Sequence, residues 1–252
     1  MKRIGIIGCG NIAALISEYD VKGTVAAVFD RHETRAARLA GKLHAKAYTD
    51  FGAFVGESYD LVIEAASVEA VQMYAEAVLA RRSAMVILSA GALTDDALKN
   101  RLEVLARAGG QRLFVPSGAL FGLDNAKVAA YGAVEGISMR STKPPEAFGV
   151  ETDVPRCLFK GAAADAVATF PRNVNAAVAL SIAAQRPVEL ELWADPRASN
   201  ITHEVRFHGA FGTATFAIEN RPSPGHPSTS FLAALSVVAL LNTLDETLHV
   251  GT

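Results

Sequence analysis

The apolar positions in the first 120 or so residues form short runs that alternate with stretches of helical spacing. Ile4, Ile6 and Ile7 make the first run, which is typical of a strand buried on both faces. Further runs predict strands over residues 24–29, 60–65, 85–89 and 112–115, and the intervening stretches predict helices over 33–43, 68–82 and 95–108. Ser67 and Thr94 are expected to cap the last two helices. This alternation is typical of an α/β fold with a parallel, doubly wound sheet.

The pattern changes after about residue 122, where an α+β segment with a mainly antiparallel sheet is expected. Strands are predicted over 136–142, 188–194, 201–207 and 213–219, and helices over 162–169 and 174–184. The last two strands form a plausible hairpin through Gly209 and Gly212. A final helix near 229–244 is apolar nearly all round, so it must be buried. We therefore expect domains over residues 1–121 and 122–226, with residues 227–252 packing back on the first.

A glycine turn follows the first strand directly. Gly8 permits the tight turn, Gly10 lets the backbone approach a pyrophosphate, and Ala13 lets the next helix pack close to the strand. Asp30 closes the second strand about 20 residues after Gly10, where an acid that binds a ribose is expected. These features predict a Rossmann-type dinucleotide-binding domain. A simple tight turn is the alternative explanation of the glycines alone.

Composition narrows the class of protein. The chain has 252 residues and a formal net charge of −2, which removes the electrostatic case for a nucleic-acid partner. Cys9 and Cys157 suggest no disulfide framework, so a reducing compartment is expected. A strand begins at once, so we expect no signal peptide, and the apolar run 231–241 is too short to span a bilayer. We expect a soluble cytoplasmic protein with no membrane partner, and the spacing of its residues indicates no metal site.

A nicotinamide-binding domain joined to a second domain predicts hydride transfer in the cleft between them, with an acid/base group from the second domain. Histidine suits that role at neutral pH. In the strand 201–207, His203 lies on the same face as Ile201 and Val205, whereas His208 lies on the polar face. The pattern alone leaves His203 equally open to catalysis and to a hydrogen-bonded place in the core.

An anionic substrate group would suit Lys143, Arg172 or Arg221, or a helix N-terminus at residues 228–230. For each basic residue the alternative is a solvated side chain. Asn173 and Asn175 could simply cap a helix, and the carboxylates Glu64 and Asp124 are interpreted as structural.

Several motifs, taken in order along nearly the whole chain, resemble the L-aspartate dehydrogenase family. They are Gly8-Cys9-Gly10-Asn11-Ile12, Glu64-Ala65-Ala66-Ser67, Pro116-Ser117-Gly118-Ala119, Phe170-Pro171-Arg172-Asn173-Val174-Asn175, Asn200-Ile201-Thr202-His203-Glu204 and Pro222-Ser223-Pro224 with Thr229-Ser230. The resemblance implies oxidation of L-aspartate by NAD or NADP, through iminoaspartate, to oxaloacetate and ammonia. It also implies a Rossmann domain, a second domain used to form a homodimer, His203 as the catalytic residue, and cofactor contacts at Ala119 and Asn173.

The expected site follows from the motifs and the resemblance together. Cofactor contacts are expected from Gly8, Gly10, Asn11, Ile12, Asp30, Arg31, Ala66, Ser67, Ala119 and Asn173, and substrate contacts from Lys143, Arg172, Asn200, Thr229 and Ser230. Asp30 repels a 2′-phosphate and favours NAD, whereas Arg31 could pair with that phosphate and permit NADP.

Two departures from the family pattern affect the expected substrate choice. Phe121 stands where the family usually has a glycine, which could narrow the space beside the nicotinamide or change the local backbone. His226 begins a loop where the family tends to have Asn-Pro-Lys-Thr-Ser, so a lysine is lost. The alternatives are another two-domain amino-acid or hydroxy-acid dehydrogenase, or a protein that senses NADH without turnover.

Overall fold

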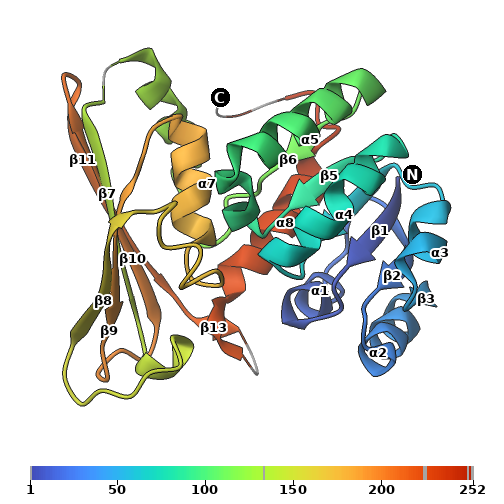
Figure 1. Cartoon of the computed structure of the whole chain (residues 1–252), viewed down its shortest axis with the longest axis horizontal. Helices are drawn as coiled ribbons and strands as arrows, with labels where there is room; N and C mark the ends of the chain where they lie inside the picture. Colours follow the sequence, from blue (N-terminus) through green and yellow to red (C-terminus); the bar gives the residue numbers. More distant parts are fainter. Residues whose placement is uncertain (1, 133, 224–225, 249, 251–252) are drawn as a thin grey trace. The chain divides into compact units, whose positions relative to one another are not determined.

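A computed structural model of the chain describes residues 2–132, 134–223, 226–248 and 250, without the side chains of 222, 223 and 226–229. The chain forms two compact units (Figure 1). The first unit is Met1–Pro116 with Ala234–Glu246, and the second is Ser117–Ala233 with Thr247–Thr252. The domain boundaries expected at residues 121 and 226 stay predictions. Within the described residues, no helix has both the length and the apolar character that crossing a membrane requires.

The first unit contains a six-stranded parallel sheet, which confirms the predicted doubly wound fold. Its strands are β1 (Arg3–Ile7), β2 (Thr24–Phe29), β3 (Lys46–Tyr48), β4 (Leu61–Glu64), β5 (Ala84–Ile87) and β6 (Leu113–Phe114). Their order is β3-β2-β1-β4-β5-β6, so the chain reverses direction across the sheet at β1 and β4. In such sheets, ligands bind at the carboxyl ends of the strands beside this reversal. Gly8 and Ala65 follow the two strands there.

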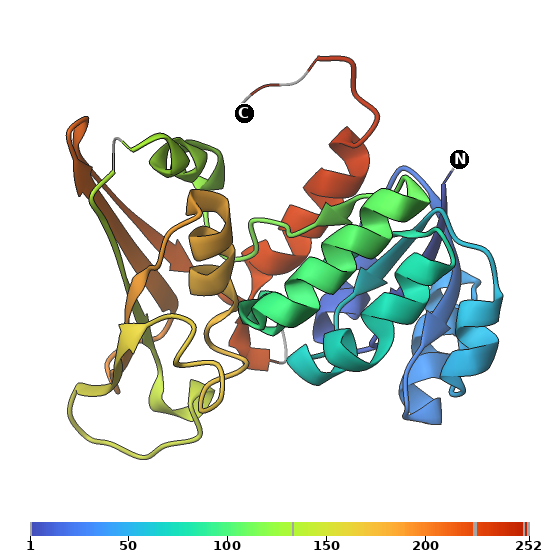
Figure 2. The same cartoon turned by 45° about the horizontal axis from the view of Figure 1, so that its top comes forward.

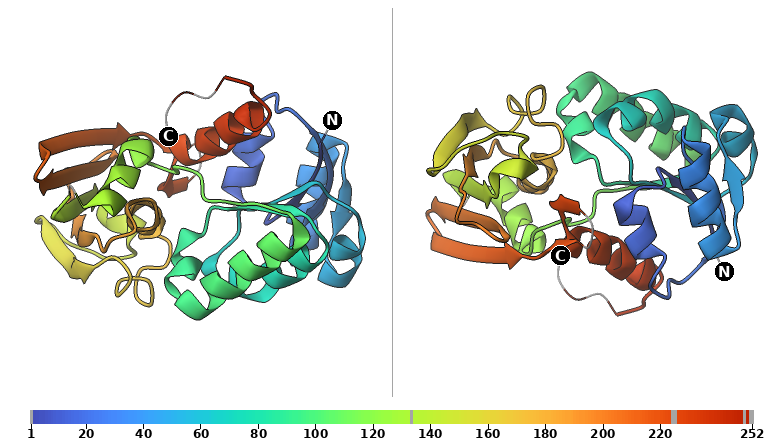
Figure 3. Two further views of the ribbon diagram at one scale, coloured as in Figure 1. Left: turned by 90° about the horizontal axis from the view of Figure 1, so that it is seen from above. Right: turned by 90° about the horizontal axis from the view of Figure 1, so that it is seen from below.

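Helices cover both faces of this sheet. They are α1 (Asn11–Ile16), α2 (Glu33–Leu43), α3 (Phe51–Gly56), α4 (Val68–Ala80), α5 (Asp96–Gly109) and most of α8 (Phe231–Thr243). Figure 3 shows α1 and α8 on one face of the sheet, and α4 and α5 on the other. The end of α8 is tied to the loop after α1, because the Asn242 side chain accepts from the Lys22 amide and donates to the Asp20 carbonyl.

The predicted cap of α4 is confirmed, and the predicted cap of α5 is wrong. The Ser67 hydroxyl accepts from the Ala70 amide at the start of α4. At α5 the cap is Asp95, which accepts from the Leu98 amide. Thr94 ends a short 3₁₀ segment, Ala90–Thr94, and its hydroxyl donates to the Gly91 carbonyl. A carboxylate is a strong N-cap acceptor, and the 3₁₀ segment already uses the threonine hydroxyl.

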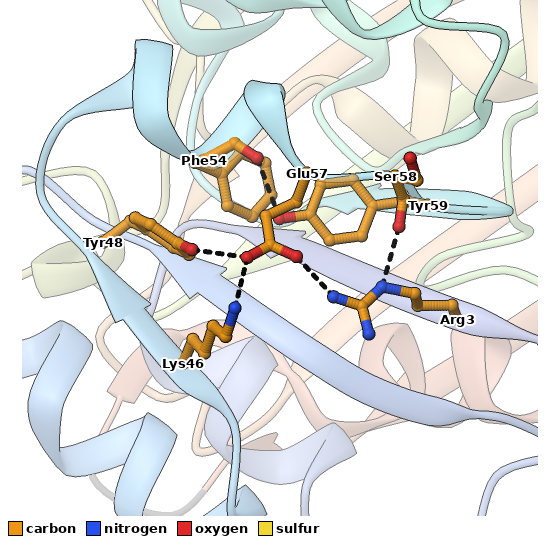
Figure 4. Close-up of polar contacts among 7 residues, drawn as sticks. All are labelled: Arg3, Lys46, Tyr48, Phe54, Glu57, Ser58 and Tyr59. Carbon is orange, nitrogen blue, oxygen red and sulfur yellow. Dashed lines mark hydrogen bonds and ion pairs between the residues drawn. The ribbon is translucent and has the colours of Figure 1, made fainter.

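The edge of this sheet at β3 is fastened by a group of charged and aromatic side chains (Figure 4). The Glu57 carboxylate accepts from Lys46 and from the Tyr48 hydroxyl, and it pairs with Arg3 at the start of β1. Arg3 also donates to the Ser58 carbonyl. The hydrogen bonds from Lys46 and Tyr48 lower the pKa of Glu57 to about 2. The group joins the segment before β4 to both β1 and β3.

The second unit contains a five-stranded sheet in the order β11-β10-β7-β9-β8. Its strands are β7 (Gly136–Lys143), β8 (Arg156–Ala162), β9 (Glu189–Ala194), β10 (Ile201–Gly209) and β11 (Gly212–Asn220). All neighbours are antiparallel except β7 and β9, which confirms the mainly antiparallel sheet. The predicted hairpin is confirmed, since β10 and β11 pair through Gly209 and Gly212. Figures 1 and 2 show α7 (Asn175–Ala184) alongside this sheet.

The predicted helix over residues 162–169 is wrong. The strand β8 runs up to Ala162, and turns follow it as far as Thr169. The Ala163 amide continues the sheet by donating to the Val188 carbonyl. Alanine favours helix only weakly, and here Ala162 pairs with β9 while the residues after it form turns. The sequence pattern also missed the strands β3, β8, β12 (Pro222–Ser223) and β13 (His226–Ser230), and the helices α3 and α6 (Leu123–Ala126).

Candidate active site

The buried face of the second sheet ends in a group of polar side chains. Alternation along β7 turns Ile137, Met139, Ser141 and Lys143 toward this face, and all four are buried. His203 on β10 lies directly across from Ser141 in the antiparallel register. Antiparallel partners share a face, so Ser141, Lys143 and His203 form one polar group at the end of an otherwise apolar layer.

Lys143 is a buried cation whose hydrogen-bond partner is neutral. Its side chain is 4% exposed, and its Nζ donates to Oδ1 of Asn173 at 2.7 Å. The ammonium also lies 5.8 Å from the centre of the Phe148 ring, within the range of a cation–π contact. None of the ion pairs among the described residues involves Lys143. Burial lowers the pKa of Lys143 to about 8.

His203 is buried as strand parity predicted, and His208 is exposed on the opposite face. Burial, together with the nearby charge of Lys143, lowers the pKa of His203 to about 3. The imidazole is therefore neutral at physiological pH. Its Nδ1 atom is enclosed and has no hydrogen-bond partner among the described residues.

The predicted contacts Asn173 and Ala119 lie in loops attached to this same face. Asn173 lies two residues before the start of α7 and bonds to Lys143. The Ala119 carbonyl accepts from the side chain of Asn220, a buried residue at the end of β11 that pairs with Ile201. Asn220 thus joins the turn at Ala119 to the end of β11, a role that the sequence pattern did not reveal.

The other predicted substrate residues are not part of the buried polar group of Ser141, Lys143 and His203. Arg172 is exposed beside Asn173, and Asn200 donates to the Glu219 carboxylate at 2.6 Å. Ser230 is buried, and its hydroxyl accepts from the Leu232 amide in the first turn of α8. The side chains of Thr229 and His226 lie outside the described residues.

The glycine turn of the first unit leaves open space beside Gly10. Gly8 has a φ of +93°, and a Cβ there would lie 2.7 Å from that of Ala66. Gly8 is therefore held in a tight turn that a larger residue would disrupt. A Cβ at Gly10 would meet nothing within 4 Å, so the backbone at Gly10 is open to a ligand. Asn11 and Ile12, which begin α1, are half-buried.

Asp30 lies at the end of β2 and binds the glycine turn directly. Its Oδ2 accepts from the Cys9 amide at 2.9 Å, and its Oδ1 accepts from the His32 amide at 2.8 Å. Burial opposes ionisation, but the two amides and the His32 ring lower the pKa of Asp30 overall. Asp30 is thus a carboxylate beside the turn, where the predicted ribose contact requires one. Arg31 next to it is exposed.

The predicted cofactor contacts Ala66 and Ser67 follow β4 and are exposed. Glu64, interpreted as structural, fixes this loop. Its carboxylate accepts from the Ala66 amide and from both the amide and the hydroxyl of Ser89 after β5. Burial raises the pKa of Glu64. The glycine turn, Asp30 and the Glu64 loop together fit a dinucleotide.

Comparison with known proteins identifies the family. Residues 4–116 match the family profile described as homoserine dehydrogenase, NAD binding domain, which confirms the predicted NAD(P)-binding domain. Residues 124–244 match the profile described as aspartate dehydrogenase, C-terminal. The L-aspartate dehydrogenase of Methanospirillum hungatei is 41% identical, with all of both chains covered. The chain belongs to the L-aspartate dehydrogenase family. The L-aspartate dehydrogenase of Methanothermobacter thermautotrophicus is 39% identical over 100% of this chain and 99% of the relative.

A solved member of the L-aspartate dehydrogenase family has the same fold. The crystal structure of aspartate dehydrogenase from Thermotoga maritima superimposes with a TM-score of 0.81 at 26% identity, and all of both chains is covered. Of the two departures from the usual pattern of this family, Phe121 is the one whose side chain the structure describes. Its side chain is 62% exposed, and the positive φ angles of its turn fall on Gly118 and Gly122 instead. Phe121 therefore requires no left-handed backbone.

Proposed function

We propose that the chain oxidises L-aspartate, with NAD or NADP as the hydride acceptor, to oxaloacetate and ammonia through iminoaspartate. Membership of the L-aspartate dehydrogenase family supports this assignment. The structural observation that carries it is the buried Lys143, a cation without a carboxylate partner among the described residues, on the same sheet face as His203. A buried cation is costly unless an anion pairs with it, and a substrate carboxylate would supply that anion.

Residues of the first unit would hold the cofactor. The backbone at Gly8, Gly10, Asn11 and Ile12 would bind the pyrophosphate, and Asp30 the hydroxyls of the adenosine ribose. Ala66 and Ser67 would also contact the cofactor. Ala119 and Asn173, which belong to the second unit, stay proposed contacts for the nicotinamide end. When bound, the nicotinamide supplies the chemistry of hydride acceptance. The carboxylate of Asp30 favours NAD, and Arg31 beside it would allow NADP.

Lys143 would bind one substrate carboxylate, and Asn173 would hold the Lys143 ammonium in place. Arg172, Asn200, Thr229 and Ser230 stay proposed contacts for the remainder of the substrate. Of these, Arg172 is the exposed cation nearest in sequence to Asn173. A substrate with two carboxylates distinguishes aspartate from the substrates of most related dehydrogenases.

His203 would move the protons of hydrolysis. Loss of hydride from C2 of aspartate leaves an iminium at that carbon. The neutral imidazole takes a proton from water as the water oxygen bonds to C2, and then returns that proton to the nitrogen. As the C–N bond breaks and ammonia leaves, the imidazole takes the remaining hydroxyl proton, so that the carbonyl of oxaloacetate forms and the imidazole ends protonated. The low pKa of His203 keeps the imidazole in the neutral, proton-accepting form before the reaction begins.

We expect the enzyme to act as a homodimer in the cytoplasm. The two cysteines that the structure leaves free, Cys9 and Cys157, suit a reducing compartment. The near-neutral charge offers no attraction to nucleic acid or to an anionic membrane surface.

Oxidation of NADH, followed at 340 nm with oxaloacetate and ammonium, tests the proposed function. We expect loss of absorbance that requires both oxaloacetate and ammonium and that produces aspartate. Loss without ammonium would instead show a hydroxy-acid dehydrogenase. Binding of NADH without consumption, with oxaloacetate, pyruvate or 2-oxoglutarate, would overturn the proposal in favour of a sensor.

A further inference from the structure

Ser141 and His203 leave two polar atoms without partners at the same place in the sheet. The hydroxyl oxygen of Ser141 and Nδ1 of His203 are the buried side-chain atoms that lack a hydrogen bond among the described residues. The two residues are direct partners in the antiparallel pairing of β7 and β10. Enclosed polar atoms without partners are rare and costly, so two on directly paired residues call for a common explanation.

The spacing allows the two atoms to satisfy each other. Directly opposed residues of an antiparallel pair have Cβ atoms about 4.5–5.5 Å apart. Rotation of the small serine side chain, or one enclosed water, spans that gap. Because the Ser141 hydroxyl can both donate and accept a hydrogen bond, its oxygen can accept a hydrogen bond from Nδ1–H of His203.

We propose that Ser141 is a positioning residue whose hydroxyl oxygen accepts a hydrogen bond from Nδ1–H of His203. This bond keeps the proton on Nδ1 and leaves Nε2 as the atom that takes the proton from water. The inference rests on the proposed role of His203 and deepens it. The tautomer of a neutral histidine is set by the hydrogen bond that its other nitrogen makes. Without that bond the proton can sit on either nitrogen, and only the Nδ1-protonated form offers a lone pair on Nε2.

Two other groups near His203 do not perform this task. Lys143 is a donor only, and its hydrogen bond goes to Asn173. Ile218, the β11 partner of His203, has no polar side chain. Ser141 is therefore the side chain whose place in the register and chemistry both suit Nδ1.

A matched pair of variants tests this proposal. Ser141→Thr keeps the hydroxyl, and Ser141→Val replaces it by a methyl group of nearly the same volume, so their difference isolates the hydroxyl from the change in packing. We expect kcat of Ser141→Val to fall roughly fivefold to tenfold below that of Ser141→Thr, with the KM for NADH equal in both. Equal kcat values would overturn the proposal.

The tautomer itself can be measured without turnover. Nitrogen NMR of protein labelled at histidine distinguishes protonated from unprotonated ring nitrogens, and His203→Gln identifies the signals of residue 203. We expect the Nδ1-protonated form in the native chain and in Ser141→Thr, and loss of that preference in Ser141→Val. An Nε2-protonated ring in the native chain would overturn the proposal. If the native enzyme consumes no NADH with oxaloacetate and ammonium, the proposed function fails, but the tautomer still decides the role of Ser141.

Discussion

Nζ of Lys143 donates to Oδ1 of Asn173 at 2.7 Å, so the last residue of β7 is joined to the loop that leads into α7. The partner is an amide, which orients the ammonium without neutralising it. The bond also links a proposed substrate contact to a proposed cofactor contact. A change at either residue should therefore disturb the binding of both ligands.

Replacement of His203 tests the proposed proton transfer. We expect His203→Ala to lower kcat by roughly 10²–10⁴-fold, because the enzyme loses its general acid/base, with little change in the Kd of NADH. Steady-state kinetics and quenching of protein fluorescence by NADH measure the two quantities. His208→Ala is the matched control, since His208 lies exposed on the same strand and on the opposite face. Unchanged turnover in His203→Ala would refute the assignment.

Replacement of Lys143 tests the proposed carboxylate contact. We expect Lys143→Met to raise the KM for oxaloacetate by roughly 10- to 100-fold, the usual effect of losing a hydrogen bond to a charged group. Lys160→Met is the control, because Lys160 is an exposed lysine of the same sheet that pairs with Glu191. An equal effect of the two substitutions on KM would contradict a specific role for Lys143.

The lowered pKa of Lys143 predicts a dependence of binding on pH. The ammonium loses its proton as the pH rises through about 8, well below the ordinary value of 10.5. Succinate stays a dianion throughout this range, so its inhibition constant reports the charge of the protein alone. We expect that constant to rise by up to about tenfold per pH unit above pH 8 in the native enzyme. Lys143→Arg keeps its charge and should show a flat profile, and a flat profile in the native enzyme would count against the carboxylate contact.

Replacement of Asp30 tests the predicted choice of cofactor. We expect Asp30→Asn to raise the KM for NADH and to increase the use of NADPH relative to NADH, because the carboxylate that repels a 2′-phosphate is gone. Arg31→Met should have the opposite effect, with weaker use of NADPH and unchanged use of NADH. The ratio of kcat/KM values for the two cofactors measures both effects. A ratio that moves in the same direction in both variants would argue against this arrangement.

Glu57 should stabilise the first unit without a part in catalysis. Its carboxylate joins Lys46, Tyr48 and Arg3, and its pKa near 2 shows that the folded chain favours the charged form. Glu57→Gln should lower Tm at pH 7, and this difference should shrink as the pH falls from 4.5 toward 2. Kinetic constants should not change. Glu18→Gln is the control, because it removes the ion pair between the exposed side chains of Glu18 and Lys42. If Glu18→Gln lowered Tm as much as Glu57→Gln does, a special role for Glu57 would be contradicted.

Much of the fold could be predicted because the local pattern and the final environment agree. The bounds of β2 and α2 match the predicted ranges 24–29 and 33–43, and β1 is buried on both faces. Strand parity also placed His203 inward and His208 outward. The errors arose where tertiary contacts decide the structure. Residues 156–162 form a strand because they pair with β9, and their sequence, Arg-Cys-Leu-Phe-Lys-Gly-Ala, lacks the regular alternation of apolar and polar residues that would indicate that pairing.

The candidate site was predictable in its titratable residues and less so in their supports. Lys143 and Asn173 were expected separately, but the bond between them depends on how a loop returns to β7. Ser141 lies two residues before Lys143, so parity alone puts the two on one face. Its partnership with His203 depends on the register of β7 and β10, which residue types do not specify. The bond from Asn220 to the Ala119 carbonyl could not be predicted, because an asparagine at a strand end usually marks a turn.

The carboxylate of Asp30 is bonded to the Cys9 amide inside the glycine turn, and this limits how the enzyme can be engineered. Asp30 would select between the two cofactors, and it also supports the glycine turn that would bind the phosphates common to both. A redesign toward NADP that removes this carboxylate would therefore weaken the binding of both NAD and NADP. Substitutions at Arg31, whose side chain is exposed, would shift the preference toward NAD without this loss, because they leave the bond between Asp30 and Cys9 in place.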